Sequence, residues 1–447
     1  MTPLLARRVL APSRGDLAGE GAGMCAERSV GHAAIVGMGI VGVATAIRLQ
    51  RAGWRVSLID REGPAAGASF GNGGVLASCA IVPVTTPGLI AKAPRMLFDP
   101  TAPLFLRWGY LPKLAPWLVR FLSHANAADA NRIADALAPI VGDSLNDHLA
   151  LATGTGAERY VVPSDYLYVY PDAAARDADG FTWAVRARHG FVPEALDAAA
   201  LGAFDPAFAG SGAIALKLGG HGRISDPGAY VAALAAHAQA QGARVVIAEA
   251  EAVVRGPGGA ATGVRLRGRD ERAETLEADA VVIATGAWSG ALTRDLGLRI
   301  PLESERGYHL ELWEPSVMPR APMMIAAGKF VATPMEGRLR LAGVVEFGGL
   351  EAGPARAPFD LLRRGIKAAM PGLRWAEERE WMGHRPAPSD SIPLIGPVPG
   401  APGAWLAFGH HHVGLTGGPR TGQLLAQMIA GERSNIDLAV YAPSRFQ

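Results

Sequence analysis

The chain has 447 residues, of which 49% are hydrophobic and 19% charged, and its net charge is +2. This composition predicts a globular protein with enough core for about two or three domains, and it excludes a wholly disordered chain. The near-neutral charge gives no reason to expect a nucleic-acid partner. No apolar run reaches the roughly 18 residues that a membrane-spanning helix needs.

Two cysteines, Cys25 and Cys79, are present. Such scarcity excludes a disulfide framework and a thiolate metal site, and it is typical of a reducing, cytoplasmic compartment. Three consecutive histidines, His410–His412, do not predict a metal site either, because neighbouring side chains on an extended segment point in different directions and no acidic cluster lies near them in the sequence.

Residues 1–30 precede the first strand-like run. Their apolar stretch is too short for the hydrophobic region of a signal peptide. We therefore expect a disordered N-terminal extension.

A nucleotide-binding pattern begins with the apolar run 33–36, which predicts a buried parallel strand. Gly37, Gly39 and Gly42 follow in G-x-G-x-x-G spacing and lead into a helix over 41–51. The first glycine allows a tight turn, the second admits a pyrophosphate, and the third lets helix and strand pack closely. Unpaired N–H groups at the helix N-terminus then face the phosphates.

A second strand, 55–59, ends at Asp60, where a carboxylate can accept hydrogen bonds from a ribose diol. The glycine-rich loop that follows contains Ser69, Asn72, Gly73 and Gly74. Small residues let backbone pack against a flat ligand, and the serine and asparagine can bind it through hydrogen bonds.

Residues 81–122 are rich in proline and aromatic residues with interspersed arginines and lysines. One interpretation is a surface that touches a membrane peripherally through residues 95–121. The favoured alternative is a set of short helices that packs against a substrate domain.

The remaining chain alternates between helical and strand-like patterns. The expected elements are a helix over 126–152, a strand over 166–170, a helix over 229–241, a buried strand over 280–284, antiparallel strands within 300–347, a helix over 359–370, a strand over 405–408 and a helix over 419–429.

Several separated motifs agree with one another. They are GMGIVG at 37–42, SFGNGG at 69–74, ATGAWS at 284–289, GHRPAPSDSIPLIG at 383–396 and FGHHHVGLTGGP at 408–419. Together they resemble the D-amino acid oxidase-like group of FAD-dependent oxidoreductases, and in particular bacterial D-amino acid and D-hydroxyproline dehydrogenases. The resemblance covers nearly all of residues 32–435.

The resemblance implies an α/β fold, α+β overall, with a Rossmann-like FAD-binding domain and a discontinuous mixed-sheet substrate domain. The expected FAD-binding segments are 31–80, 220–299 and 381–447, and the expected substrate-domain segments are 81–219 and 300–380.

The resemblance also implies FAD as cofactor. The residues expected to hold it are Gly37, Gly39, Ile40, Val41, Gly42, Asp60, Arg61, Ser69, Asn72, Gly73, Gly74, Val253, Ala284, Gly286, Trp288, Gly409, His410, Gly414, Leu415 and Thr416. Neither cysteine lies at the C-terminal position that some relatives use for covalent attachment, so we expect noncovalent FAD.

Dehydrogenation of an amino acid requires a clamp for its carboxylate and a neutral amine. Arg385 is expected to bind the carboxylate, because a guanidinium makes bidentate, always-charged contacts. Tyr308 is expected to cap the carboxylate and His309 to accept a proton from the ammonium group. The alternative for each is a structural role at the domain boundary.

The expected activity is oxidation of a D-amino acid, with D-hydroxyproline and D-proline among the candidates, by hydride transfer from Cα to flavin N5. The resemblance implies an electron acceptor such as a quinone, and a cytoplasmic enzyme that is peripheral on the inner face of the membrane if residues 95–121 touch it. The alternatives are a glycine- or sarcosine-type amine oxidase that releases hydrogen peroxide, and a noncatalytic flavin-binding subunit of a complex.

Overall fold

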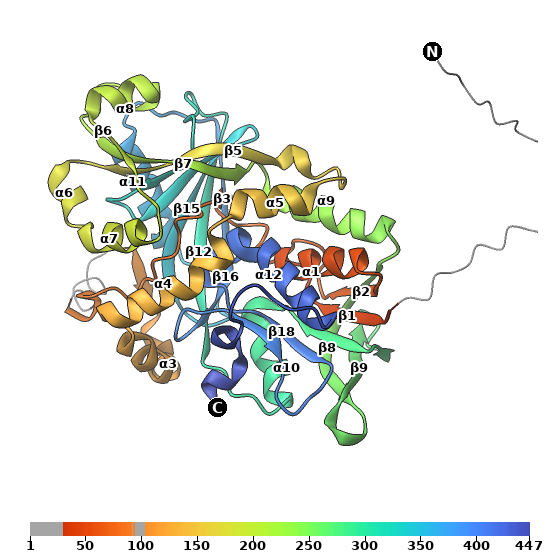
Figure 1. Cartoon of the computed structure of the whole chain (residues 1–447). Coiled ribbons are helices and arrows are strands. Elements are labelled where there is room, and N and C mark those ends of the chain that lie inside the picture. The colour runs from red at the N-terminus through yellow and green to blue at the C-terminus, as the bar shows by residue number, and fades with distance from the viewer. Residues whose placement is uncertain (1–29, 92, 94–102) are drawn as a thin grey trace, which may run out of the picture.

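The computed structural model describes residues 30–91, 93 and 103–447. Two β-sheets form the framework, and helices cover them (Figure 1). The expected N-terminal extension lies, apart from residue 30, outside the described residues.

The first sheet has the strand order β10-β9-β8-β2-β1-β11-β18-β17. Its strands are β1 (His32–Val36), β2 (Arg55–Asp60), β8 (Arg244–Arg255), β9 (Ala261–Gly268), β10 (Ala273–Glu277), β11 (Ala280–Ile283), β17 (Leu394–Pro397) and β18 (Ala404–Phe408). The strands β8, β2, β1, β11 and β18 run parallel, so their carboxyl ends meet at one edge. The central strands are buried from end to end, as parallel strands covered on their two faces must be.

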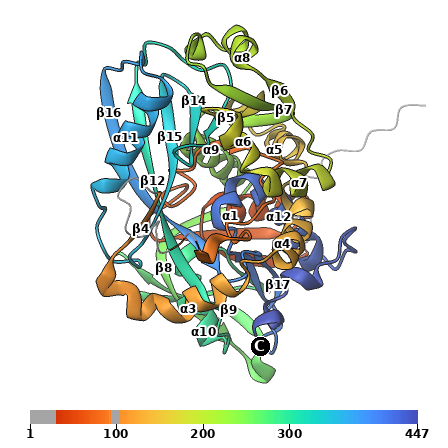
Figure 2. The ribbon, with the colours of Figure 1, turned by 90° about the vertical axis from the view of Figure 1, so that its left-hand side faces the viewer.

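Helices from distant parts of the chain cover one face of this sheet (Figures 1 and 2). They are α1 (Ile40–Arg51), α4 (Ala127–Val141), α5 (Ser144–Ala152), α9 (Pro227–Ala240) and α12 (Gly414–Ile429). The opposite face carries α10 (Ser289–Asp295), and the β9–β10 hairpin at the end of the sheet also packs towards this face, so that both contribute to a second apolar cluster. This arrangement confirms the Rossmann-like architecture expected for the cofactor domain.

The second sheet has the strand order β16-β12-β15-β14-β13-β5-β7-β3. Its strands are β3 (Val75–Leu76), β5 (Val161–Tyr170), β7 (Ile214–Ile224), β12 (Leu302–Trp313), β13 (Met323–Ile325), β14 (Phe330–Met335), β15 (Arg338–Phe347) and β16 (Glu377–Pro388), with β4 (Leu104–Leu106) and β6 (Glu194–Leu196) at its margins. The helix α11 (Ala357–Ala369) buries its apolar side against this sheet in a core cluster of its own. Three further helices, α6 (Ala173–Asp177), α7 (Gly180–Arg188) and α8 (Ala198–Phe204), lie near its other end.

The expected segment boundaries do not coincide with the division between the sheets. The boundary at 380 falls inside β16, which belongs to the second sheet, and β3 lies before the boundary at 80 although it pairs with β7. The expected helix over 126–152 is two helices, α4 and α5, and these pack on the first sheet's helices.

The C-terminal helix begins earlier than its sequence predicts. The expectation placed its start at Pro419, because proline favours the first turn of a helix. In the structure α12 begins at Gly414 and Pro419 lies inside it. The helix therefore begins five residues earlier than expected, close behind the histidine segment His410–His412.

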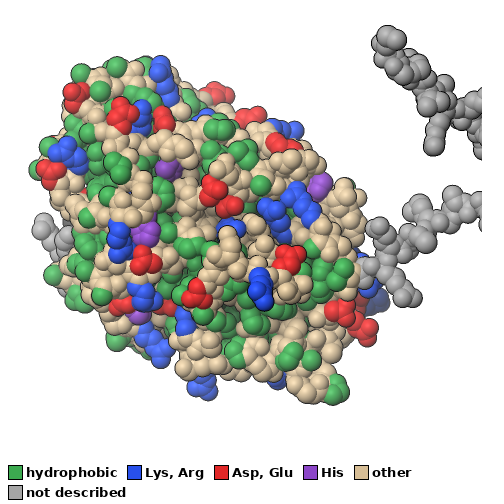
Figure 3. All heavy atoms as spheres, in the orientation of Figure 1, with side chains coloured by type: hydrophobic (Ala, Val, Ile, Leu, Met, Phe, Trp, Pro, Cys, Tyr) green, Lys and Arg blue, Asp and Glu red, His purple; other side chains and the backbone are tan. Residues whose placement is uncertain are grey.

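Part of the stretch proposed as a membrane contact is a helix, α3 (Leu111–Ser123), with Trp117 and Phe121 buried against Phe347. This packing is the role that the favoured alternative assigned to the stretch; residues 95–102 of it lie outside the described residues. None of the helices in the described part of the chain is long and apolar enough to cross a bilayer. On the face shown in Figure 3, acidic and basic side chains are interspersed.

The packing of α12 on α1 depends on glycine. A Cβ atom at Gly422 would lie 2.7 Å from the backbone of Ala44 and Thr45 in α1. We expect Gly422→Ala to lower the free energy of unfolding by about 1–3 kcal/mol, because backbone atoms cannot move aside as a flexible side chain can. Thermal and urea unfolding midpoints measure this loss.

Gly180→Ala is the matched control, because Gly180 is also helical and has nothing within 4 Å of an added Cβ. Alanine there should leave stability unchanged or raise it slightly. Equal midpoints for the two variants would contradict the packing argument.

Candidate functional site

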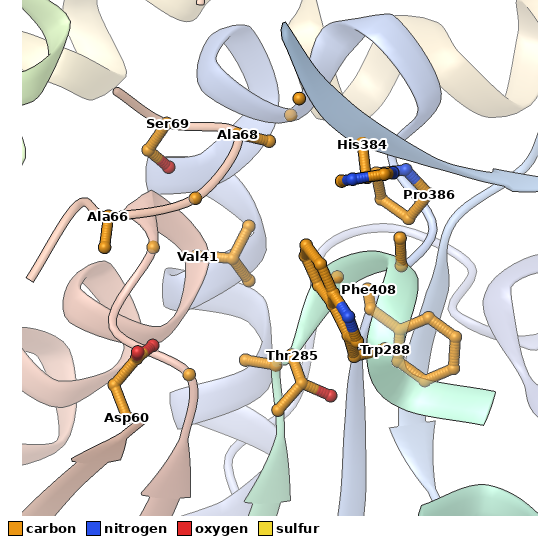
Figure 4. Close-up of a pocket in the computed structure, with 18 of the residues that line it drawn as sticks. Val41, Asp60, Ala66, Ala68, Ser69, Thr285, Trp288, His384, Pro386 and Phe408 are labelled. Atoms are coloured by element: carbon orange, nitrogen blue, oxygen red, sulfur yellow. The ribbon is translucent and has the colours of Figure 1, made fainter. Parts of the chain in front are cut away.

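A cavity of about 760 Å³ lies at the carboxyl ends of β1, β11 and β18, against β16 of the second sheet. Ligand sites in open α/β sheets occur at this edge of the sheet. Figure 4 shows Val41, Ser69 and Asp60 on one side of the cavity and Trp288, His384 and Pro386 on the other. The wall opposite Asp60 and Ser69 therefore combines β16 of the second sheet with Trp288, which follows β11 of the first sheet.

The turn after β1 is possible only with glycine at two positions. Gly37 has φ +110°, and a Cβ atom there would lie 2.4 Å from the carbonyl oxygen of Ala284. A Cβ at Gly42 would lie 2.0 Å from the carbonyl oxygen of Gly37. These two glycines bring the turn, α1 and β11 into contact, and so form the floor of the cavity.

The N-terminus of α1 opens onto the cavity. Gly39 is its N-cap residue and provides no side-chain cap. The Oγ of Ser69 accepts a hydrogen bond of 3.0 Å from the Ile40 N–H, which fixes the loop after β2 beside the helix end. The remaining first-turn N–H groups and the helix dipole favour an anion at this place.

Asp60 ends β2 on the cavity wall. Its carboxylate accepts hydrogen bonds from the backbone N–H groups of Met38 at 2.9 Å, Glu62 at 2.9 Å and Gly63 at 3.2 Å. A carboxylate has about four acceptor positions, so one more donor can be bound. Asp60 thus holds the turn in place and keeps capacity for a ligand hydroxyl.

Arg61 and Trp288 close the wall on the outer side. The Arg61 guanidinium lies over the Trp288 ring, 4.4 Å from its centre, and the ring meets His384 edge-on at 5.1 Å. Burial, followed by repulsion from Arg306 and Arg61, lowers the pKa of His384 to about 4. Its imidazole is therefore neutral at physiological pH.

A buried ion pair holds the glycine-rich loop against the second sheet. The Arg340 guanidinium donates to Glu311 at 2.6 Å and to the carbonyl oxygens of Phe70 at 3.0 Å and Asn72 at 2.7 Å. His309 also binds this loop, since its Nδ1 lies 3.0 Å from the Gly71 carbonyl oxygen. The loop is thereby held by residues that lie 238 to 270 positions away from it in the sequence.

Arg385 lies on the cavity wall in β16, with its guanidinium above Gly307 of β12. It donates to the carbonyl oxygens of Val344 at 3.1 Å and Gly343 at 3.2 Å. The pairing of β12 with β15 shifts register at this point, and Val344 has φ +58°. Two of its five N–H groups are used, so the guanidinium can still bind an anion.

The histidine segment after β18 forms the end of the cavity near Arg385. His410 is buried, with its Nε2 2.8 Å from the Thr421 hydroxyl, and burial lowers its pKa to about 4. His411 has φ +51° and lies with Nε2 2.9 Å from the buried Glu305 carboxylate. Its Nδ1 is 2.7 Å from Nδ1 of His412, whose side chain opens onto the cavity.

Most of the residues expected to hold a cofactor lie on the cavity wall. These are Gly37, Gly39, Ile40, Val41, Asp60, Arg61, Ser69, Asn72, Ala284, Gly286, Trp288, His410, Gly414 and Leu415. Arg385 joins them, so the structure brings the expected carboxylate clamp to the same cavity.

Six expected residues do not line the cavity. Gly42, Gly73, Gly74 and Gly409 are close-approach positions against backbone or apolar side chains, and Thr416 donates to the Val75 carbonyl oxygen. Val253 is buried in an apolar cluster. The residues of β8 that line the cavity are Ala248, Glu249 and Ala250, which lie a few positions before Val253 in the strand.

Tyr308 and His309 also lie off the cavity wall, which corrects their expected roles. The Tyr308 ring packs edge-on against Phe359 of α11, and its hydroxyl donates to Glu346 of β15 at 2.5 Å. His309 is 2% exposed and stacks on Trp381 at 5.0 Å. Burial, followed by repulsion from Arg340, lowers the pKa of His309 to about 3. Successive residues of a strand face opposite sides, and neither side chain reaches the cavity.

Other residues on the wall were absent from the expectation. Among them are Thr285, Trp381, His384, Phe408, His411 and His412, and the Glu305 carboxylate lies 2.9 Å from Nε2 of His411. His384 and the three histidines lie within the sequence motifs that resemble those of the family, so their place at the site could have been predicted. The contact between His411 and Glu305 could not have been predicted, because the two residues are 106 positions apart and only the fold brings them together.

The residues present fit FAD. The glycine turn and the open N-terminus of α1 suit a pyrophosphate, and Asp60 keeps one acceptor for a ribose hydroxyl. Trp288, Arg385 and His412 line the same cavity, so it also presents polar and charged side chains that could bind a second ligand. Among the described residues, no group of three or more histidine, cysteine, aspartate or glutamate side chains is placed to hold a metal ion.

Comparison with known proteins agrees with this geometry. The profile of the family described as FAD dependent oxidoreductase matches residues 32–428. The chain is 38% identical to a protein of Bradyrhizobium diazoefficiens named D-amino-acid oxidase, over 93% of this chain and 99% of that protein. It is 31% identical to a protein of Dechloromonas aromatica named D-amino acid dehydrogenase, over 89% and 97% of the two chains.

Among solved structures, the chain is similar to glycine oxidase from Geobacillus kaustophilus, with a TM-score of 0.68 and 22% identity over 93% of this chain and 98% of that one. It is also similar to L-proline dehydrogenase from P. horikoshii, with a TM-score of 0.68 and 16% identity over 94% and 98% of the chains. These two likenesses establish a shared fold.

Gly39 offers a test of the cavity that leaves the fold intact. Its φ of −74° suits any residue, and an added Cβ would meet only the Ser69 hydroxyl, at 3.2 Å. We expect Gly39→Val to reduce the FAD retained after purification at least tenfold, because its methyl groups fill the space beside the helix N-terminus. Flavin absorbance per protein measures retention.

Gly39→Ala is the graded control and should retain more FAD than Gly39→Val. Circular dichroism of the FAD-stripped proteins should be the same for wild type and both variants. Full FAD retention by Gly39→Val would show that this part of the cavity does not hold the cofactor.

Proposed function

Because the chain belongs to the family of FAD-dependent oxidoreductases that includes D-amino acid oxidases and dehydrogenases, we propose that it oxidises D-amino acids. It is an enzyme that uses FAD to oxidise amino acids. The D configuration is supported by the names of its curated relatives. D-Hydroxyproline and D-proline are among the substrates that we propose.

The proposal depends mainly on the position of the Arg385 guanidinium in the cavity. The guanidinium is a half-buried cation on the wall of the cavity, and two backbone carbonyl oxygens fix its orientation. Burial lowers the pKa of Arg385, and the nearby Glu305 partly opposes this effect. Arginine nevertheless remains charged at physiological pH, so it can bind a substrate carboxylate with two parallel hydrogen bonds.

FAD supplies the two-electron chemistry when it is bound, through hydride transfer from Cα to flavin N5. The chain's own contribution is to orient the amino acid and to exclude water. Arg385 fixes the carboxylate, and Trp381 and His384 on the same strand narrow the space around it. Holding Cα in one place converts a bimolecular encounter into a positioned reaction.

The proposed enzyme is either a dehydrogenase or an oxidase, and the two differ in the molecule that accepts electrons from the reduced flavin. The expectation is a quinone or a similar acceptor, as in dehydrogenases, and several curated relatives carry that name. The relative at 38% identity is named an oxidase, which favours oxygen as the alternative acceptor. Hydrogen peroxide released per substrate oxidised distinguishes the two.

Anaerobic bleaching of the flavin tests the substrate class. The purified yellow protein is mixed with D- and L-forms of a panel of amino acids, with both hydroxyproline epimers and with glycine and sarcosine. Bleaching by D-amino acids alone is the expected result. Bleaching only by glycine or sarcosine would support the amine-oxidase alternative, and no bleaching by any compound would support a noncatalytic flavin subunit.

Replacing Arg385 tests the carboxylate clamp. We expect Arg385→Met to raise KM for a D-amino acid by about 10- to 100-fold, since hydrogen bonds to charged groups contribute about 1.5–3 kcal/mol. FAD content should stay at the wild-type level, because the cofactor turn and Asp60 are untouched. Initial rates at a range of substrate concentrations measure the change.

Gly307→Ala is a second variant that keeps the cation. Its Cβ would lie 2.5 Å from Cζ of Arg385, so the guanidinium must move although the fold need not. KM should rise here too, by a smaller factor than in Arg385→Met. An unchanged KM in the two variants would remove Arg385 from the substrate site.

A further inference from the structure

Three side chains form a continuous hydrogen-bonded line from the protein interior to the cavity. Glu305 of β12 is 3% exposed and lies 2.9 Å from Nε2 of His411. Nδ1 of His411 lies 2.7 Å from Nδ1 of His412. His412 opens onto the cavity, and the described residues give its Nε2 no hydrogen bond.

The Glu305 carboxylate determines how the protons are arranged along this line. Burial alone would raise the pKa of Glu305, but attraction to His411 and the hydrogen bond from it, together with attraction to Arg385, lower the pKa below its usual range. An ionised carboxylate only accepts hydrogen bonds, so Nε2 of His411 carries a proton. When His411 is neutral, its Nδ1 is therefore an acceptor, and the hydrogen between the two rings belongs to Nδ1 of His412.

This arrangement leaves Nε2 of His412 without a proton and facing the cavity. A neutral imidazole has one donor and one acceptor nitrogen, and its donor is already used. The His412 side chain is exposed only to the cavity, and desolvation by the surrounding protein atoms, followed by repulsion from His411 and opposed by Glu305, lowers its pKa to about 3. His412 can therefore accept a proton only if it passes one on.

The position of His412 matches the chemistry of an amino acid. Arg385 of β16 is the cross-strand partner of Glu305, and Arg385 and His412 line the same cavity, so a fixed cation and a proton acceptor lie at one end of it. An α-amino acid presents a carboxylate and an ammonium group on adjacent atoms. A carboxylate bound at Arg385 therefore brings the ammonium group towards His412.

Building on the proposed function, we propose that Glu305, His411 and His412 form a proton relay that neutralises the substrate ammonium group before oxidation. An N–H bond of the ammonium breaks and a bond to Nε2 of His412 forms, while the Nδ1 proton of His412 passes to Nδ1 of His411. His412 ends neutral in its other tautomer. His411 ends as an imidazolium ion beside the Glu305 carboxylate, where the two charges attract.

The surrounding groups agree with this direction of transfer. Phe121 of α3 stacks on the His411 ring at 6.4 Å and offers no competing acceptor. His410 is bound to Thr421, and His384 of β16 to Ser304. Glu305 and Arg385 are thus the charged groups that act on His412 from β12 and β16. In this scheme His412 is a catalytic residue, and His411 and Glu305 are positioning residues.

The pH dependence of anaerobic flavin reduction tests the relay. We expect His412→Phe to reduce the rate constant at neutral pH by about 10²-fold or more, within the range of general base catalysis. The deficit should disappear above the pKa of the substrate amine, because the amine then arrives neutral. Glu305→Gln should behave in the same way with a smaller deficit, since a neutral amide does not attract the positive charge that His411 acquires.

His237→Asn on α9 is the control, since His237 lies away from the cavity. It should match wild type at every pH. Propanoate, a carboxylate without an amine, should perturb the flavin spectrum of His412→Phe at the same concentration as in wild type, which shows an intact fold and clamp. A loss in His412→Phe by one factor at all pH values would overturn the relay.

Nitrogen NMR of the histidine-labelled holoenzyme gives a readout that needs no turnover. The signal lost in His412→Phe identifies His412, and we expect a protonated Nδ1 and a bare Nε2. A protonated Nε2 would make His412 a hydrogen-bond donor and would overturn the proposal. Failure of all amino acids to bleach wild type would instead refute the proposed function, while the tautomer is measured independently.

Discussion

The cavity depends on close backbone contact at the carboxyl ends of β1 and β11. A Cβ at Gly37 would lie 2.4 Å from the carbonyl oxygen of Ala284, and one at Gly42 would lie 2.0 Å from that of Gly37. Because α1 begins so near the sheet edge, its N–H groups point into the space between the sheets rather than into solvent. The neighbouring wall residues are bound to this turn and helix: the Ser69 hydroxyl accepts from the Ile40 N–H, and the Asp60 carboxylate accepts from the Met38 N–H.

The second sheet completes the site through buried charge. Arg340 joins Glu311 to the carbonyl oxygens of Phe70 and Asn72, so a loop that begins in the first domain is held by the second. Removing one partner of such a pair leaves an uncompensated buried charge, which costs about 3–5 kcal/mol. The relative position of the sheets is thus specified by directional bonds as well as by apolar packing, and this is what keeps the wall carrying Arg385 at a fixed place opposite the glycine turn.

The features that could be predicted from the sequence are local ones. The strand, glycine turn and helix at 32–51 could be located because their spacing reflects contacts within a short segment. Arg385 could be located because its motif is distinctive. Tyr308 could not, because the face to which a strand residue points depends on register, and a bulge between β12 and β15 lies beside it. The boundary at 380 was misplaced for a related reason, since β16 pairs with β12 across about 70 residues that no local pattern connects.

In the proposed reaction, the end of the cavity that contains Arg385 and His412 must bind two substrate groups of opposite charge. A substrate carboxylate needs a permanent cation, whereas its ammonium group needs a site that takes a proton without being positive beforehand. In the proposed function Arg385 meets the first requirement, and its charge would by itself repel the second group. Glu305 resolves this conflict, because it lies behind the histidines, attracts positive charge to His411 and is too deeply buried to meet the substrate directly. The negative charge thus acts through two neutral rings, so the cavity surface itself presents one cation and one neutral acceptor.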